Sequence, residues 1–170
     1  DYSPARALAR AARRGPGRLS LVDAATGERW TVSQSFDAVA RLAGAFRRRG
    51  LGAGTRIALI GANSAWHFLC HAAASWLHAV TVPLSPRLPS SALASMCVRV
   101  GVTWAFVDES ASLHARALAD AGIRTFPWDD LRSWTRHDDP IAGEPARCGA
   151  ELAAILFTSG STGMPRPVEL

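Results

Sequence analysis

The chain has 170 residues, a length that suits one domain or one domain with an incomplete neighbour. Hydrophobic residues make up 48% of the sequence, which is enough to bury a core and argues against disorder. The net charge is +5, from 19 basic and 14 acidic residues, and every basic residue is Arg. Because this bias indicates coding composition more than a selected surface, we expect no nucleic-acid partner.

The three cysteines Cys70, Cys97 and Cys148 are widely spaced and form no C-x-x-C pair. They predict neither a disulfide framework nor a zinc site, and they favour a reducing, cytoplasmic compartment. No apolar run approaches the roughly 18 residues of a membrane-spanning helix. We therefore expect no membrane span.

The first 34 residues are expected to form a leading helix and a hairpin. Helical spacing of apolar residues over 1–14 ends at Gly15-Pro16-Gly17. Two short apolar runs, 19–23 and 29–32, then flank a turn over 24–27. This pattern predicts a β-hairpin.

Residues 35–127 alternate between helical and strand-like patterns. The first helix is expected to start with Ser35 as its N-cap and to end before Gly50. Such alternation predicts an α/β fold with a mostly parallel sheet and helices on both faces. The later elements expected here are a strand over 56–60, a helix over 65–78 capped by Asn63 or Ser64, a helix over 90–100, a strand over 103–107, a helix over 110–121 and a strand over 123–126.

The last two segments differ sharply in polarity. Residues 128–149 contain many Asp, Pro and Gly residues, and we expect them to form a surface excursion. The final segment, 150–170, begins with the unbroken apolar run 152–157, which predicts a buried strand. A loop of small hydroxyl residues and glycines follows and is closed by Arg166.

This loop has the composition of a phosphate-binding site. Glycine lets several backbone N–H groups turn toward one point, hydroxyls add short donors, and Arg166 supplies a positive charge. The P-loop of nucleotide triphosphatases is excluded, because Gly160 and Gly163 are three residues apart and no Lys follows. The plain alternative is a Ser/Gly-rich turn between two strands.

The nine residues T-S-G-S-T-G-M-P-R over 158–166 resemble the phosphate loop of the adenylate-forming superfamily, whose usual pattern is T-S-G-[ST]-T-G-x-P-K-G. Residues 54–64 resemble a second passage of that family, G-D-R-V-A-[LI]-x-x-x-N-S. Residues 76–89 resemble a third, in which His78 replaces the usual Gly. At the end of the loop, Arg166 and Pro167 stand where the family usually has Lys and Gly; proline fixes its own φ and lacks an N–H donor.

The resemblance implies that the chain is the N-terminal portion of the large domain of an adenylate-forming enzyme. Such an enzyme joins a small-molecule carboxylic acid to ATP with Mg²⁺, forming an acyl-adenylate and pyrophosphate. It then passes the acyl group to the thiol of coenzyme A or of a carrier protein. The implied triphosphate contacts are Thr158, Ser159, Gly160, Ser161, Thr162, Gly163 and Arg166; no catalytic residue is assigned.

Three forms of this hypothesis stay open. Residues 63–64 and 82–89 look closer to acyl-CoA synthetases, as in fatty acid metabolism, whereas Ser161 is common in adenylation domains of peptide or polyketide synthetases. The third form is a non-catalytic truncated remnant that acts as an interaction module. The family's later motifs, including a catalytic Lys, have no counterpart in a chain without Lys. We expect these 170 residues alone to be inactive in adenylation.

Other candidate clusters have simpler interpretations. His67 and His71 share a helix face, but the Glu of an H-E-x-x-H zinc motif is replaced by Phe68, so a packed face without metal is expected. The acidic pairs 108–109 and 129–130 are expected to be caps or solvated turns. Basic clusters at Arg13, Arg14, Arg18 and 47–49 are expected to face water.

Overall fold

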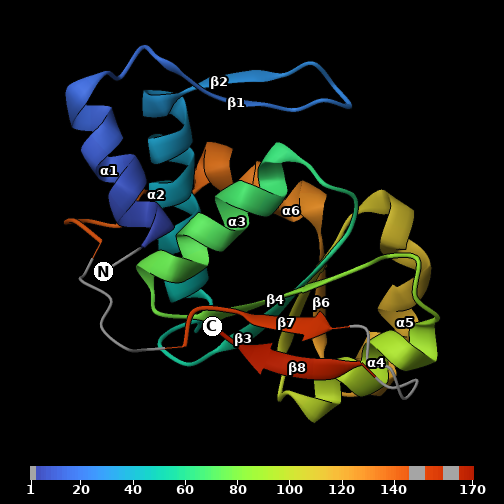
Figure 1. Ribbon diagram of the computed structural model, residues 1–170. Helices are drawn as coiled ribbons and strands as arrows, with labels where there is room; N and C mark the ends of the chain where they lie inside the picture. Colours follow the sequence, from blue (N-terminus) through green and yellow to red (C-terminus); the bar gives the residue numbers. More distant parts are fainter. Residues whose placement is uncertain (1–2, 146–151, 159–164) are drawn as a thin grey trace. The chain divides into compact units, whose positions relative to one another are not determined.

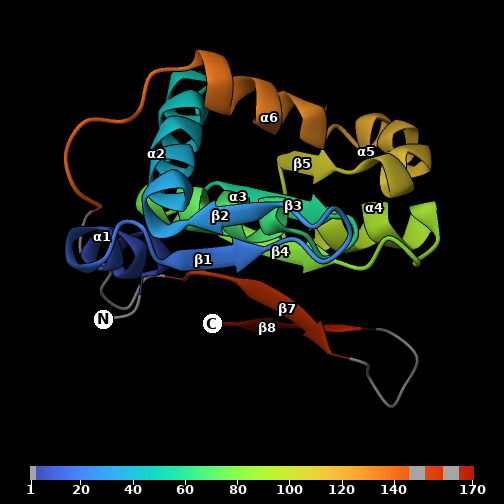
Figure 2. The same ribbon diagram turned by 90° about the horizontal axis from the view of Figure 1, so that it is seen from above.

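The computed structural model describes residues 3–145, 152–158 and 165–170. The chain divides into two compact units, each described here by itself; Figure 1 and Figure 2 show their elements in two views. The helical unit comprises Asp1–Ala53, Asn63–His78 and Asp129–Glu151, and the sheet unit comprises Gly54–Ala62, Ala79–Trp128 and Leu152–Leu170.

The helical unit is built from helices that contact one another beside a short hairpin. Helices α1, α2 and α3 pack pairwise against each other (Figure 1). The predicted hairpin is confirmed, with two antiparallel strands. The elements are α1 (Pro4–Arg14), β1 (Leu19–Val22), β2 (Arg29–Thr31), α2 (Val32–Arg48), α3 (Ala65–Trp76) and α6 (Trp128–His137).

Helix α2 starts earlier than the sequence predicted. Thr31 is its N-cap: the Thr31 hydroxyl accepts the N–H of Gln34 at 3.2 Å, and the Gln34 side chain accepts the N–H of Thr31 at 2.8 Å. This reciprocal capping box satisfies two donors that a helix start otherwise leaves open. The prediction of Ser35 as N-cap was therefore wrong, and Ser35 is buried within the first turns.

The carboxylate of Asp23 joins the hairpin to α3. It accepts the backbone N–H groups of Ala25 and Thr26 in its own turn, at 3.1 and 3.2 Å. It also accepts the N–H of Ala65, the first residue of α3, at 2.9 Å. Ser64 occupies the predicted cap position of α3 but makes no side-chain capping bond, so Asp23 supplies the missing acceptor.

The chain after α6 passes very close to the backbone of α2. The N–H of Ile141 donates to the carbonyl of Ala40 at 2.9 Å. Asp138 contacts the C-terminal end of α2 through Arg48 at 2.7 Å and Arg49 at 3.2 Å. At Gly44 there is no space for a side chain, because an added Cβ would collide with the carbonyl oxygen of Asp139.

The sequence predicted a surface excursion over 128–149. Residues 128–137 instead form helix α6, so this prediction was wrong for that part. The helix buries Leu131 and Trp134, and Trp134 packs edge-to-face on Phe46 with ring centroids 6.1 Å apart. Arg49 covers the Trp134 ring at 4.1 Å. Trp128, Leu131 and Trp134 recur every three residues, which gives an apolar stripe on an otherwise polar helix.

The sheet unit contains a four-stranded parallel sheet in the order β4-β3-β5-β6. The predicted α/β class, a parallel sheet flanked by helices, is confirmed. The helix expected over 110–121 is divided into a 3₁₀ turn and a short α-helix. The elements are β3 (Arg56–Ile60), β4 (Val80–Leu84), α4 (Ser90–Arg99), β5 (Trp104–Val107), η1 (Glu109–His114), α5 (Ala115–Asp120) and β6 (Arg124–Pro127).

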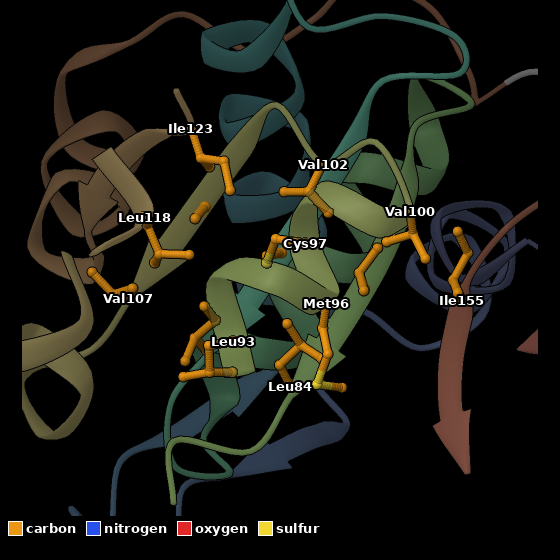
Figure 3. Packing of buried hydrophobic residues seen from close by; sticks show 14 of the residues in the cluster. Leu84, Leu93, Met96, Cys97, Val100, Val102, Val107, Leu118, Ile123 and Ile155 are labelled. Atoms are coloured by element: carbon orange, nitrogen blue, oxygen red, sulfur yellow. The ribbon is translucent and has the colours of Figure 1, made fainter. Parts of the chain in front are cut away.

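The core of the sheet unit lies between the sheet and the helices α4 and α5. Figure 3 shows Leu93, Met96 and Cys97 of α4 among side chains from the sheet, with Leu118 of α5 nearby. Burial raises the pKa of the Cys97 thiol to about 12. Burial also raises the pKa of Cys70 in the helical unit, so both thiols are protonated core residues near neutral pH.

The last two strands form a separate antiparallel ribbon, β7 (Ile155–Thr158) with β8 (Arg166–Glu169). The sequence predicted a buried strand over 152–157, but the observed strand begins at Ile155 and is only partly buried, so this prediction was wrong. Ile155 is buried, whereas Leu156 is 41% exposed, because a ribbon with one covered side alternates along the strand. No helix among the described residues is long and apolar enough to cross a membrane.

Candidate functional site

The ribbon brings together the two described ends of the predicted phosphate loop. Thr158 and Arg166 are partners in the β7–β8 register, and the Thr158 hydroxyl lies 3.4 Å from the carbonyl oxygen of Arg166. A hydroxyl and a guanidinium therefore occupy the same end of the ribbon. The other predicted contacts, Ser159, Gly160, Ser161, Thr162 and Gly163, lie outside the described residues.

The register also decides what Pro167 does to the ribbon. Ala154 and Leu170 exchange both of their backbone hydrogen bonds, at 2.9 and 3.2 Å. Because hydrogen-bonded and non-hydrogen-bonded pairs alternate in an antiparallel ladder, Phe157 and Pro167 form a non-hydrogen-bonded pair. Proline at this position removes no bond between the two strands.

Residues just before each strand of the ribbon form hydrogen bonds with other elements of the sheet unit. The N–H of Thr81 in β4 donates to the carbonyl of Ala153 at 3.1 Å, just before β7. On the other arm, the guanidinium of Arg99 at the end of α4 donates to the carbonyl of Pro165 at 3.3 Å. The segment before β7 and the segment before β8 are thus held by different elements, β4 and α4.

Arg56 belongs to the second passage that resembles the family, and it also supports the ribbon. Its guanidinium donates to the carbonyl of Val100, just past α4, at 2.6 Å. A second nitrogen lies 3.9 Å from the carboxylate of Glu169 in β8. Sequence reasoning missed this role, since both partners are more than 40 residues away.

The Arg166 guanidinium is available to a ligand. Arg166 is exposed, and its guanidinium forms no hydrogen bond or ion pair with any residue in the described part of the chain. A planar guanidinium offers paired donors that match phosphate or carboxylate oxygens. The described end of the ribbon can therefore bind an anionic group.

The third passage owes its shape to a buried histidine that the sequence did not single out. His114 is 2% exposed; its Nε2 lies 2.9 Å from the carbonyl oxygen of Pro86, and its Nδ1 lies 2.8 Å from the hydroxyl of Ser90. A carbonyl can only accept, so Nε2 is the donor in the bond to Pro86. His114 thereby positions the turn between β4 and α4.

The backbone conformation at His78 shows why the family pattern usually has Gly at this position. Its φ of 55° lies in the left-handed region, which Gly enters without steric cost. The structure therefore places a bulky side chain where the backbone geometry favours none. The conformation turns the chain from α3 toward β4.

The carboxyl ends of β3 and β5 are joined by Asp108. Its carboxylate accepts N–H groups from Ala62 at 2.6 Å and Ala111 at 2.9 Å, and the Ser110 hydroxyl at 2.6 Å. A Cβ at Gly61 would lie 2.6 Å from the same carboxylate. The predicted cap role of Asp108 is confirmed, and its oxygens are occupied by protein donors rather than facing a ligand.

The remaining candidate clusters do not assemble a metal centre. Within 3–145, 152–158 and 165–170, no group of three or more His, Cys, Asp or Glu side chains is placed to hold a metal ion. Burial, and then the charge of His67, lowers the pKa of His71. Asp129 and Asp130 lie in the first turn of α6, where carboxylates complement the helix dipole.

The profile of a family described as "AMP-binding enzyme" matches residues 8–170. The 2-succinylbenzoate–CoA ligase of Listeria innocua is 28% identical over 165 residues, which cover 95% of this chain and 32% of the ligase. The non-ribosomal peptide synthetase CmlP of Streptomyces venezuelae is 32% identical over 169 residues, covering 93% of this chain and 16% of CmlP. The chain thus spans about a third or less of these relatives.

Solved structures agree with the fold. A fatty acyl CoA synthetase of Mycobacterium tuberculosis superposes with a TM-score of 0.89 at 21% identity, over 99% of this chain and 34% of the synthetase chain. The N-terminal domain of FACL13 from the same organism gives a TM-score of 0.89 at 25% identity, over 100% of this chain and 44% of that domain.

Proposed function

Because the chain belongs to the AMP-binding enzyme family, we propose that it is the N-terminal part of an ATP-dependent ligase that couples a carboxylic acid to a thiol. The family and the relatives are ligases of the adenylate-forming type. In the proposed reaction the acid attacks ATP, forms an acyl-adenylate and releases pyrophosphate. The acyl group then passes to coenzyme A or to a carrier-protein thiol, in the cytoplasm.

The observation that carries this proposal is the pairing of Thr158 with Arg166 at the open end of the ribbon. Negative charge builds on the pyrophosphate as it leaves, and donors fixed in advance stabilise that charge without reorganisation. Arg166 supplies a full charge, and the Thr158 hydroxyl donates to the Arg166 carbonyl and so joins the two strands at this end. We propose that residues 159–163 provide the further contacts to the triphosphate.

Mg²⁺ belongs to the proposal as a partner of the nucleotide. The described residues offer no cluster of carboxylates near Arg166, and Glu169 lies beside Arg56. Mg²⁺ is commonly held by one or two carboxylates together with substrate phosphates. This chain's proposed part is thus to hold the phosphates, while the ion neutralises part of their charge.

Replacing Arg166 by Ala is expected to weaken ATP binding by roughly ten- to hundredfold, since a charged hydrogen bond contributes about 1.5–3 kcal/mol. Isothermal titration calorimetry of the 170-residue chain with ATP measures the change. Arg166→Lys keeps the charge but loses the planar fork, so it should fall between wild type and Arg166→Ala. Equal ATP affinity for wild type and Arg166→Ala would rule out the proposed phosphate site.

These 170 residues alone are expected to release no pyrophosphate above background when given ATP, Mg²⁺ and a panel of carboxylic acids. The chain spans 32% of the Listeria ligase, and it contains no Lys for the catalytic role that the family resemblance implies. A coupled pyrophosphate assay measures this. Turnover that disappears in Arg166→Ala would show that the chain is catalytically complete and would overturn the expectation.

A second candidate is the adenylation domain of a peptide or polyketide synthetase. It is favoured by Ser161 in the loop and by 32% identity to CmlP and to the hybrid synthetase pydA of Acremonium sp. The two candidates differ in the acceptor thiol. Acyl transfer by the complete protein to coenzyme A supports the first candidate, and transfer only to a carrier protein supports the second. Pro167 departs from the family pattern but removes no bond between the ribbon strands, so it does not favour the remnant hypothesis.

A further inference from the structure

Three arginines of the helical unit line one open groove. Arg10 and Arg14 come from α1, one helical turn apart, and Arg18 follows the helix just before β1. The groove has a volume of about 450 Å³, within the range of small-molecule sites. Its other lining residues are small or apolar: Ala7, Ala11, Gly15, Leu19 and Val32.

Three arginines of this region have no charged partner among the described residues. Residues 3–22 contain five Arg and no Asp or Glu. Within the part of the chain that the structure describes, the guanidinium groups of Arg10, Arg14 and Arg18 form no hydrogen bond or ion pair, whereas neighbouring Arg13 contacts Glu144. The helix dipole accounts for a cation in the last turn of α1, but Arg10 lies a turn earlier and Arg18 lies beyond the helix.

The position of Arg18 is built into the local fold. The N–H of Val32 donates to the carbonyl of Arg18 at 2.8 Å, and the N–H of Ser33 donates to the carbonyl of Pro16 at 3.0 Å. The Arg18 side chain crosses Gly15, where an added Cβ would lie 2.7 Å from the Arg18 Cδ. The absence of a side chain at residue 15 therefore lets Arg18 reach over the groove.

We propose that this groove, defined by Arg10, Arg14 and Arg18, binds a compact polyanion that carries two or more phosphate or carboxylate groups. Three planar guanidinium forks can each pair with two oxygens of such a ligand. The small floor residues leave room for the ligand to approach the helix backbone. The groove belongs to the helical unit, whereas the proposed phosphate loop belongs to the sheet unit.

Titration of the ¹⁵N-labelled 170-residue chain with sodium tripolyphosphate tests the proposal by NMR. We expect saturable shifts of the Gly15 and Gly17 amides, with binding weakened about tenfold in Arg14→Ala. Arg47→Ala removes the same charge from an exposed position outside the groove and should leave these shifts unchanged. Arg166→Ala should also leave them unchanged, which separates this site from the proposed function.

Gly15→Ala gives a second test that changes no charge. Its φ of −163° is open to Ala, but the methyl group displaces Arg18, so affinity should fall several-fold while circular dichroism stays native. A parallel titration with citrate separates carboxylates from phosphates: binding of both supports a general polyanion site, and binding of tripolyphosphate alone supports a phosphate ligand. Absence of saturable shifts with either anion, or equal affinities in Arg14→Ala, Gly15→Ala and wild type, would overturn the proposal.

Discussion

Replacing Gly44 by Ala is expected to destabilise the protein by roughly 3 kcal/mol, although Ala is the better helix former by about 1 kcal/mol. The new methyl group would collide with the carbonyl oxygen of Asp139 and lie 3.1 Å from the N of Ile141. Both neighbours are backbone atoms, and Ile141 is hydrogen-bonded to Ala40 on the same helix. The segment must shift as a whole, which also separates Asp138 from Arg48 and Arg49.

Urea unfolding followed by circular dichroism measures this loss. Gly52→Ala is the matched control, because Gly52 has open space around its Cβ position and no positive φ. The control should unfold within about 0.5 kcal/mol of wild type. A Gly44→Ala variant as stable as the control would show that residues 138–141 are not in close contact with α2 at Gly44.

Replacing Asp23 by Ala is expected to cost roughly 3 kcal/mol of stability at neutral pH. The carboxylate is 4% exposed and accepts three backbone N–H groups, including that of Ala65 at the start of α3. Its removal leaves these donors without the acceptor they face in the folded chain. Asp23→Asn, which keeps one acceptor oxygen, should lose less than Asp23→Ala.

The same carboxylate gives stability a defined dependence on pH. The hydrogen bond from Ala65 lowers the pKa of Asp23, burial opposes the shift, and the bonds from Thr26 and Ala25 add to it. A carboxyl group whose pKa is lower in the folded state stabilises fully above its unfolded pKa of about 3.9. That contribution is lost as the pH falls through the folded pKa.

Urea midpoints of wild type and Asp23→Asn from pH 7 to pH 2 check this dependence. The stability gap should be constant down to about pH 4 and then narrow as the wild-type carboxylate is protonated. A gap that stays constant over the whole range would mean that the charge of Asp23 contributes nothing to the fold.

Much of the fold was predictable because local patterns and burial coincide. Apolar spacing, together with Gly and Pro at the boundaries, predicts the strand over 56–60, the end of α2 before Gly50 and the start of α4 at Ser90. The errors arose where two local signals competed. Ser35 and Thr31 are both good caps, and only the Gln three residues after Thr31 decides between them.

Helix α6 was missed for a different reason. Its polar residues outnumber its apolar ones, so composition suggested a surface loop. The three-residue spacing that ends in Trp134 was present in the sequence. However, its partners Phe46 and Arg49 lie more than 80 residues away, and no local pattern indicates that contact.

The candidate site was predictable only in part. Thr158 and Arg166 were named from the loop pattern, and the ribbon register brings them together. The contacts of Arg56, Arg99 and His114 could not be read from the sequence, because all three side chains bind backbone carbonyls. Every residue has such a carbonyl, so side-chain identity does not reveal the partner.

The register of Pro167 has one more consequence, at the side of β8 that faces away from β7. Residues in non-hydrogen-bonded pairs direct their backbone groups outward, and here those residues are Pro167 and Glu169. In the part of the chain that the structure describes, only Glu169 therefore offers a backbone N–H group on this side, because proline has none. A strand from another molecule that paired with this side would lack a hydrogen bond at Pro167. The missing donor therefore protects the ribbon against edge-to-edge aggregation.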